Sequence, residues 1–167
     1  MAEAAQNNEV KAGLDKVQAF DVVGVSTIIK DRDEASEQIN GLWERFFKES
    51  VGQSVDSKVD DIIYAVYSDY EGDYTQPYRL TIGYKTQKCE QRDALLRDGK
   101  FHMVQVEEAD YAMMSAAGEQ PKALMETWTA VWQSDLERLY KTDFEVYGQR
   151  FFEEGVHEVL VAVGVNV

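Results

Sequence analysis

Several short segments are rich in apolar and β-branched residues, which predicts the strands of a sheet. They lie at 17–29, 62–70, 78–84, 101–106, 111–116, 144–150 and 156–165. Segments of this length, bounded by glycine, proline or acidic clusters, are typical of β-strands. Residues 1–15 show little periodicity and are expected to form a flexible tail, so a single folded domain is expected over 16–167.

Two other segments repeat their apolar residues every three to four positions, the spacing of an amphipathic helix. The first helix is expected to begin in the acidic run 31–38, to carry its apolar face over 39–47 and to end near Val51 and Gly52. The second is expected over 119–139, with Pro121 in its first turn. The charged segment 85–100 has the weakest pattern and is expected to be irregular.

The two halves of the chain resemble each other. The segment YAVY at 64–67 resembles FEVY at 144–147 at an offset of 80, and 78–84 resembles 159–165 at an offset of 81. Neither half, roughly 16–88 or 100–167, could bury its helix face and sheet face alone. We therefore expect an α+β fold: tandem pseudo-twofold β-α-β-β repeats that form one antiparallel sheet, with two helices on one face and a groove between them.

Composition narrows the classes of function. The net charge is −14, with 17 Lys and Arg against 31 Asp and Glu, which disfavours nucleic acids and anionic membranes as partners. A single cysteine, Cys89, excludes an internal disulfide, and two histidines, His102 and His157, disfavour a structural zinc site. No segment has the pattern of a membrane span or of a signal peptide. We expect a cytoplasmic protein without metal or cofactor.

The order of motifs resembles a known family. The motifs are LWxxF at 42–46, YAVYSDYE at 64–71, YRLTIGY at 78–84, the alanine-containing segment 112–117 followed by a glycine, a second helix with tryptophan, DFEVY at 143–147 and the closing apolar run 159–165. Together they resemble the GyrI-like, or AraC-type effector-binding, domain over about residues 17–165. No single motif is specific, but their order and spacing are.

The resemblance implies a small-molecule groove. Many members of this family bind lipophilic organic cations with aromatic walls and a carboxylate near the floor of the pocket. They occur as the sensing part of multidrug-responsive transcription regulators or as free-standing proteins, including ones carried on mobile gene cassettes. The family's acidic position corresponds to Glu145 and the tyrosine of the same motif to Tyr147. The chain has no room for a helix-turn-helix, so we expect a stand-alone binding module.

Strand alternation places Glu145 and Tyr147 on one face of their strand, and Phe144 and Val146 on the other. The pattern alone leaves two arrangements open: either Phe144 faces the core and Glu145 faces solvent, or Glu145 faces the groove, as the resemblance implies. A buried carboxylate needs a partner, which a hydroxyl of Tyr147 or Tyr67, or a bound organic cation, could supply.

Aromatic residues of the helices and the neighbouring strand are the expected walls of the groove, with simple core packing as the alternative for the helix residues. Together with Glu145 and Tyr147, the candidate ligand-binding residues are Trp43, Phe47, Tyr67, Trp128 and Trp132.

Three functions remain open from the sequence. The first is binding of lipophilic, cationic aromatic compounds, for sequestration or in connection with transcription regulation. The second is hydrolysis of strained electrophiles, with Glu145 as general base and Tyr147 as donor to the leaving group. The third is a protein-interaction role of the gyrase-inhibitor type. The sequence is compatible with a monomer or a dimer.

Overall fold

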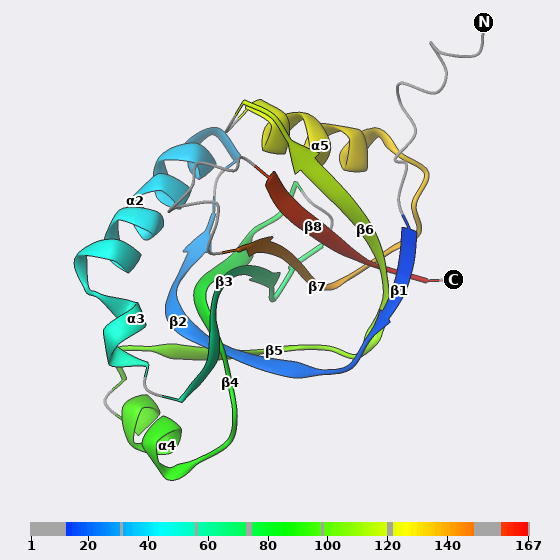
Figure 1. Ribbon diagram of the computed structural model, residues 1–167. Helices are drawn as coiled ribbons and strands as arrows, with labels where there is room; N and C mark the ends of the chain where they lie inside the picture. The colour runs from blue at the N-terminus through cyan, green and yellow to red at the C-terminus, as the bar shows by residue number, and fades with distance from the viewer. Residues whose placement is uncertain are drawn as a thin grey trace, which may run out of the picture.

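The computed structural model describes residues 13–30, 32–55, 57–72, 75–97, 99–119, 122–148 and 158–166. Its elements are β1 (Gly13–Val17), β2 (Phe20–Ile29), η1 (Arg32–Glu34), α2 (Ala35–Lys48), α3 (Val51–Ser54), β3 (Lys58–Ser68), β4 (Tyr78–Thr86), α4 (Glu90–Arg97), β5 (His102–Val106), β6 (Ala109–Ala117), α5 (Lys122–Gln133), β7 (Arg138–Tyr147) and β8 (Glu158–Val165). The strands form one antiparallel sheet that curls strongly (Figure 1).

The strand order reveals the internal repeat. The sheet runs β1-β6-β8-β7-β3-β4-β2-β5, so the unit β2-α2-β3-β4 corresponds to β6-α5-β7-β8. Each of the short strands β1 and β5 pairs with the outer strand of the opposite half. β3 and β7 meet at the centre, where Ala65 lies opposite Glu145. These two residues are also equivalents in the 80-residue repeat, so a pseudo-twofold axis passes between them, and the predicted tandem α+β fold is confirmed.

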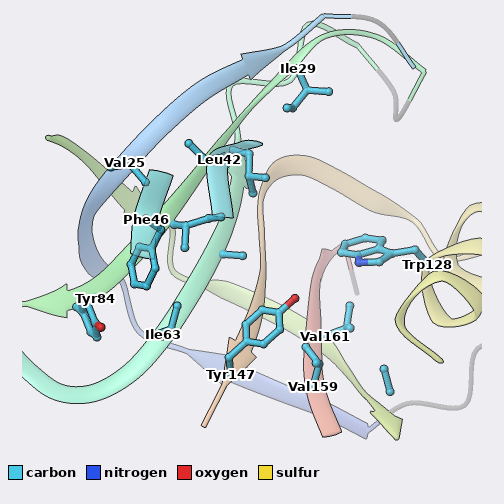
Figure 2. Packing of buried hydrophobic residues seen from close by; sticks show 14 of the residues in the cluster. Val25, Ile29, Leu42, Phe46, Ile63, Tyr84, Trp128, Tyr147, Val159 and Val161 are labelled. Carbon is cyan, nitrogen blue, oxygen red and sulfur yellow. The ribbon is translucent and has the colours of Figure 1, made fainter. Parts of the chain in front are cut away.

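Helices α2 and α5 cover one face of the sheet. Leu42 and Phe46 of α2 and Trp128 of α5 belong to one continuous hydrophobic core with residues of the strands. Figure 2 shows Phe46 directed toward Tyr84, at 5.7 Å between ring centroids, and Trp128 and Tyr147 reaching toward one another from α5 and β7. Helices α2 and α5 therefore both pack against the centre of the sheet.

The opposite face of the sheet is also buried. Phe20 of β2 and Phe144 of β7 are not on neighbouring strands, yet their ring centroids are only 5.5 Å apart. The sheet therefore folds over on this side, where Val22, Val66 and Tyr111 join a second apolar cluster. Because both faces are covered, Phe144 and Glu145 are both buried although they point in opposite directions.

Several sequence-based boundaries are corrected. Residues 13–15, expected in the tail, belong to β1 and pair with β6. The first helix ends at Lys48 and is followed by the short α3, and the second ends at Gln133 rather than at residue 139, because β7 begins at Arg138. The segment 85–100 contains α4, whose buried residue is Arg92, held by Asp21 at 2.7 Å. Pro121, His157 and most of the expected tail lie outside the described residues.

A candidate ligand-binding site between two helices

A cavity of about 310 Å³ lies between the start of α2 and α5, where the groove between the helices was predicted. This volume falls within the range of small-molecule sites. Its walls come from β2, α2, β3, β4 and α5, from the loop between β3 and β4, and from the first residue of β7. The aromatic and buried charged residues among them are Tyr67, Tyr70, Tyr78, Trp128, Trp132 and Arg138.

Five of these side chains form a closed ring of contacts. The ring centroids are separated by 5.2 Å for Trp128 and Tyr67, 5.6 Å for Tyr67 and Tyr78, and 5.8 Å for Tyr78 and Tyr70. The guanidinium carbon of Arg138 closes the circuit, at 5.9 Å from the Tyr70 ring and 6.0 Å from the Trp128 ring. Aromatic faces of this kind offer both apolar contact and attraction for cations.

Glu145 lies behind this ring, with 2% of its surface exposed. Its Oε2 accepts hydrogen bonds from the Tyr67 hydroxyl at 2.8 Å and from the Trp128 indole Nε1 at 2.7 Å. Its Oε1 accepts one from the Tyr147 hydroxyl at 2.7 Å. All three donors are neutral, and none of the residues that the structure describes forms an ion pair with this carboxylate.

Burial sets the protonation of this cluster. It raises the pKa of Glu145 above 4.5, because the ionised form is poorly solvated, while the hydrogen bonds from Tyr147, Trp128 and Tyr67 oppose that rise. Burial and the charge of Glu145 hold the pKa values of Tyr67 and Tyr147 well above the ordinary value of 10.0. The same two causes raise the pKa of Tyr78 to about 12. The tyrosines therefore stay protonated at neutral pH, and Tyr67 and Tyr147 remain donors to Glu145.

A second buried acid on the same face of β7 has a counter-ion. The fully buried Asp143 accepts hydrogen bonds through Oδ2 from Arg138 Nη2 at 2.7 Å and from the Tyr70 hydroxyl at 2.5 Å. Its Oδ1 accepts one from the backbone N–H of Gly164 at 2.8 Å. Asp143 therefore forms an ion pair with Arg138, whereas Glu145 has no counter-ion among the residues that the structure describes.

The structure brings most of the predicted site residues together. Tyr67, Trp128 and Trp132 line the cavity, and Glu145 is bonded to the first two of them. Tyr147 is 5% exposed and reaches Glu145 from the side away from the cavity, so it is not among the lining residues. Glu145 is buried rather than exposed to solvent, and Phe144 is buried on the opposite face, so neither of the two arrangements left open by the strand pattern is observed in full.

Trp43 and Phe47 lie on the other side of the pseudo-twofold axis. Trp43 is the counterpart of Trp128: its ring is 4.9 Å from that of Tyr147, as Trp128 is 5.2 Å from Tyr67. Phe47 stacks on Trp43 at 6.0 Å and is 53% exposed. Neither is among the residues that line the cavity, and their role in ligand binding stays a prediction.

Tyr70, Tyr78 and Arg138 line the cavity but are not among the candidate residues predicted from the sequence. Tyr70 ends the strand expected over 62–70 and Tyr78 begins the strand expected over 78–84, and the strand pattern does not assign either residue to the groove. The available signal was the density of tyrosine between residues 64 and 84. Arg138 had no such signal, because the pattern placed it at the end of the second helix.

The described residues offer neither a membrane-spanning helix nor a cluster of metal ligands. Among them, no helix combines the length and apolarity needed to cross a bilayer. Within the same ranges, no three side chains of His, Cys, Asp or Glu cluster in a way that could hold a metal ion.

The curled sheet of tandem repeats and the aromatic cavity with a buried carboxylate behind it define an effector-binding domain of the GyrI-like type, as the sequence motifs predicted. The sequence profile of the Cass2 family, described as integron-associated effector binding proteins, matches residues 14–163. The chain belongs to this family and is therefore a small-molecule-binding protein. No curated protein matches it.

Solved structures share the fold. The integron cassette protein VCH_CASS2 from the mobile metagenome of Vibrio cholerae is 23% identical, with a TM-score of 0.72 over 95% of this chain and 98% of that one. SAV2435 bound to tetraphenylphosphonium is 16% identical, with a TM-score of 0.73 over 93% and 94%. The C-terminal domain of EcmrR is 10% identical, with a TM-score of 0.53 over 93% and 97%. At these identities the likeness establishes the fold.

Proposed function

We propose that this protein binds lipophilic, cationic aromatic compounds in the cavity between α2 and α5, in the cytoplasm, with Glu145 as the counter-charge. The observation that carries the proposal is a buried carboxylate whose described partners are all neutral donors, set directly behind an aromatic cavity. A buried ionised carboxylate without a counter-ion costs several kcal/mol. A ligand cation offsets part of that cost.

The carboxylate acts on the ligand across the rings of Tyr67 and Trp128, because Glu145 itself is not a lining residue. At an effective dielectric constant of 20, a cation roughly 7 Å away still gains about 2 kcal/mol. Each well-placed aromatic face adds about 0.5–2 kcal/mol. Such a site selects by charge and apolar area rather than by a fixed hydrogen-bond pattern. The structural neighbour SAV2435, solved with the lipophilic cation tetraphenylphosphonium, supports this ligand class.

The hydrolase alternative has less support. Both oxygens of Glu145 are engaged by donors, and Tyr147 lies away from the cavity. A general base and its partner need to reach the substrate directly or through one water. The protein-interaction alternative is supported only by the net charge of −14.

The test compares two probes of nearly equal size, the cation 1-methyl-4-phenylpyridinium and the neutral 4-methylbiphenyl. Affinities are measured by tryptophan fluorescence for the wild type, Glu145→Gln and Glu108→Gln. Glu108 is a matched control, since its side chain is 49% exposed and the substitution removes the same unit of charge. We expect Glu145→Gln to weaken the cation about tenfold or more and the neutral probe far less, with Glu108→Gln close to wild type. Equal losses for both probes, or no binding of the cation by the wild type, would contradict the proposal.

A further inference from the structure

Arg138 places a buried positive charge in the wall of the cavity, whose other charged lining residue, Lys30, is exposed. Its side chain is 4% exposed, and its guanidinium lies over the Tyr140 ring at 4.3 Å. The residue lines the cavity, whereas its partner Asp143 does not. The ion pair therefore presents its positive end to the cavity.

The positive charge of Arg138 is only partly compensated. Nη2 bonds to Asp143, but the buried Nε and Nη1 have no hydrogen-bond acceptor within the part of the chain that the structure describes. Charge-assisted bonds to a carboxylate are strongest when both prongs of the guanidinium are engaged. A single engaged nitrogen leaves more of the positive potential directed at the aromatic rings around it.

The electrostatic potential in the cavity is therefore negative near Glu145 and positive near Arg138. Trp128 connects them: its Nε1 donates to Glu145 at 2.7 Å, and its ring centre is 6.0 Å from the guanidinium carbon of Arg138. A bound cation is favoured beside Tyr67, whose hydroxyl bonds to Glu145, and disfavoured beside the guanidinium of Arg138. A ligand with one positive charge meets both conditions when its neutral end lies toward Arg138. A rigid ligand with a positive charge at each end cannot.

Building on the proposed function, we infer that Arg138 is a specificity-determining residue that restricts this site to monocations and excludes dications of the same size. The second charge of a dication loses its hydration and faces a guanidinium instead of a carboxylate. Without Arg138, two acids without a counter-ion, Glu145 and Asp143, lie behind the wall, and their combined charge matches a dication.

The experiment uses two probes that are nearly isosteric: the monocation 1-methyl-4-phenylpyridinium and the dication 1,1′-dimethyl-4,4′-bipyridinium. Their affinities are measured by isothermal titration calorimetry at one fixed ionic strength. We expect the wild type to prefer the monocation by about tenfold or more. Arg138→Lys, which keeps the charge, is expected to keep that preference. Arg138→Met is expected to lower the ratio by about tenfold or more through tighter binding of the dication.

Two results overturn the inference. One is a wild type that binds both probes equally, a measurement that needs no variant and so does not depend on the folding of Arg138→Met. The other is an unchanged ratio in Arg138→Met, provided that its thermal unfolding remains cooperative. In either case, monocation binding that still depends on Glu145 leaves the proposed function intact. Absence of monocation binding in the wild type would contradict both the proposed function and the role inferred for Arg138.

Discussion

Tyr67 and Tyr147 occupy equivalent positions in the two halves of the fold, 80 residues apart, and donate hydrogen bonds to opposite oxygens of Glu145. The carboxylate lies beside the pseudo-twofold axis, and each half supplies one hydroxyl from its own side. Only Tyr67 also lines the cavity. Both tyrosines therefore hold the carboxylate, but only Tyr67 is placed to contact a ligand in the cavity.

Replacing either tyrosine by phenylalanine is expected to shift the pH dependence of cation binding. Tyr67→Phe and Tyr147→Phe each remove one donor that opposes the raised pKa of Glu145, so this pKa rises further. Each variant also loses about 1 kcal/mol of stability. The affinity for tetraphenylphosphonium, titrated between about pH 5 and 8, should rise at a higher pH in both variants than in the wild type. Coincident profiles would show that these hydroxyls do not tune Glu145.

The raised pKa of Glu145 also predicts the sign of a stability change. Above pH 4.5 the unfolded chain loses this proton while the folded protein still holds it, so ionisation favours the unfolded state. The contribution of Glu145 to the free energy of unfolding is therefore full below that pH and is lost as the pH rises through the folded-state pKa.

Denaturant unfolding of the wild type and Glu145→Gln at a series of pH values measures this contribution. The stability of the wild type minus that of the variant should decrease with rising pH. The other acidic residues are common to both proteins and cancel in the difference. An increase of the difference with pH would mean that the hydrogen bonds outweigh burial and lower the pKa instead.

Fluorescence distinguishes the tryptophans on the two sides of the axis. Trp128 and Trp132 line the cavity and Trp43 does not. The emission change on binding of tetraphenylphosphonium should persist in Trp43→Phe and decrease strongly in Trp128→Phe. Affinity should fall in Trp128→Phe, because it also loses the N–H that bonds to Glu145. A change that disappears in Trp43→Phe instead would place the ligand on the other side of the axis.

A cross-strand pair of glycines is expected to be intolerant of substitution. Gly24 and Gly83 face each other between β2 and β4, and a Cβ at Gly24 would lie 1.9 Å from the carbonyl oxygen of Ile82. Gly24→Ala should destabilise the protein by about 3 kcal/mol or more. An added Cβ at Gly41, in α2, would meet no atom within 4 Å apart from its chain neighbours and the backbone of its own helix, so Gly41→Ala should stabilise the protein by about 1 kcal/mol. Denaturant midpoints measure both, and equal shifts would contradict this explanation.

The sequence identified the acid of the site but could not establish its burial. Phe144 and Val146 flank Glu145, and strand alternation determines only which residues share a face. Burial of both faces results from the curl of the sheet, which brings Phe20 against Phe144 from strands that are not neighbours. Curvature is a property of the whole sheet, so the local pattern could not decide whether Glu145 is buried or exposed. Only the family resemblance favoured burial.

Other parts of the structure depend on interactions that apolar periodicity does not detect. Helix α4 is anchored by the charged Arg92. Arg138 belongs to β7, whose pairing with β8 shifts register between Arg138 and Asp143, and Tyr140 within this stretch has a positive φ of 54°. Tyrosine does not favour that conformation. Nothing in the local sequence therefore predicted that Arg138 would line the cavity.

Glu145 and Ala65 face each other across the pseudo-twofold axis, which has a consequence for how such a site can be built. In a symmetric dimer of identical half-domains, both residues at the axis would be the same. Two alanines would supply no charge, and two glutamates would face each other on adjacent strands and repel. Because both halves belong to one chain, one position is alanine and the other glutamate. A single polypeptide can thus hold an odd number of charges at its own axis, which two identical chains related by that axis cannot.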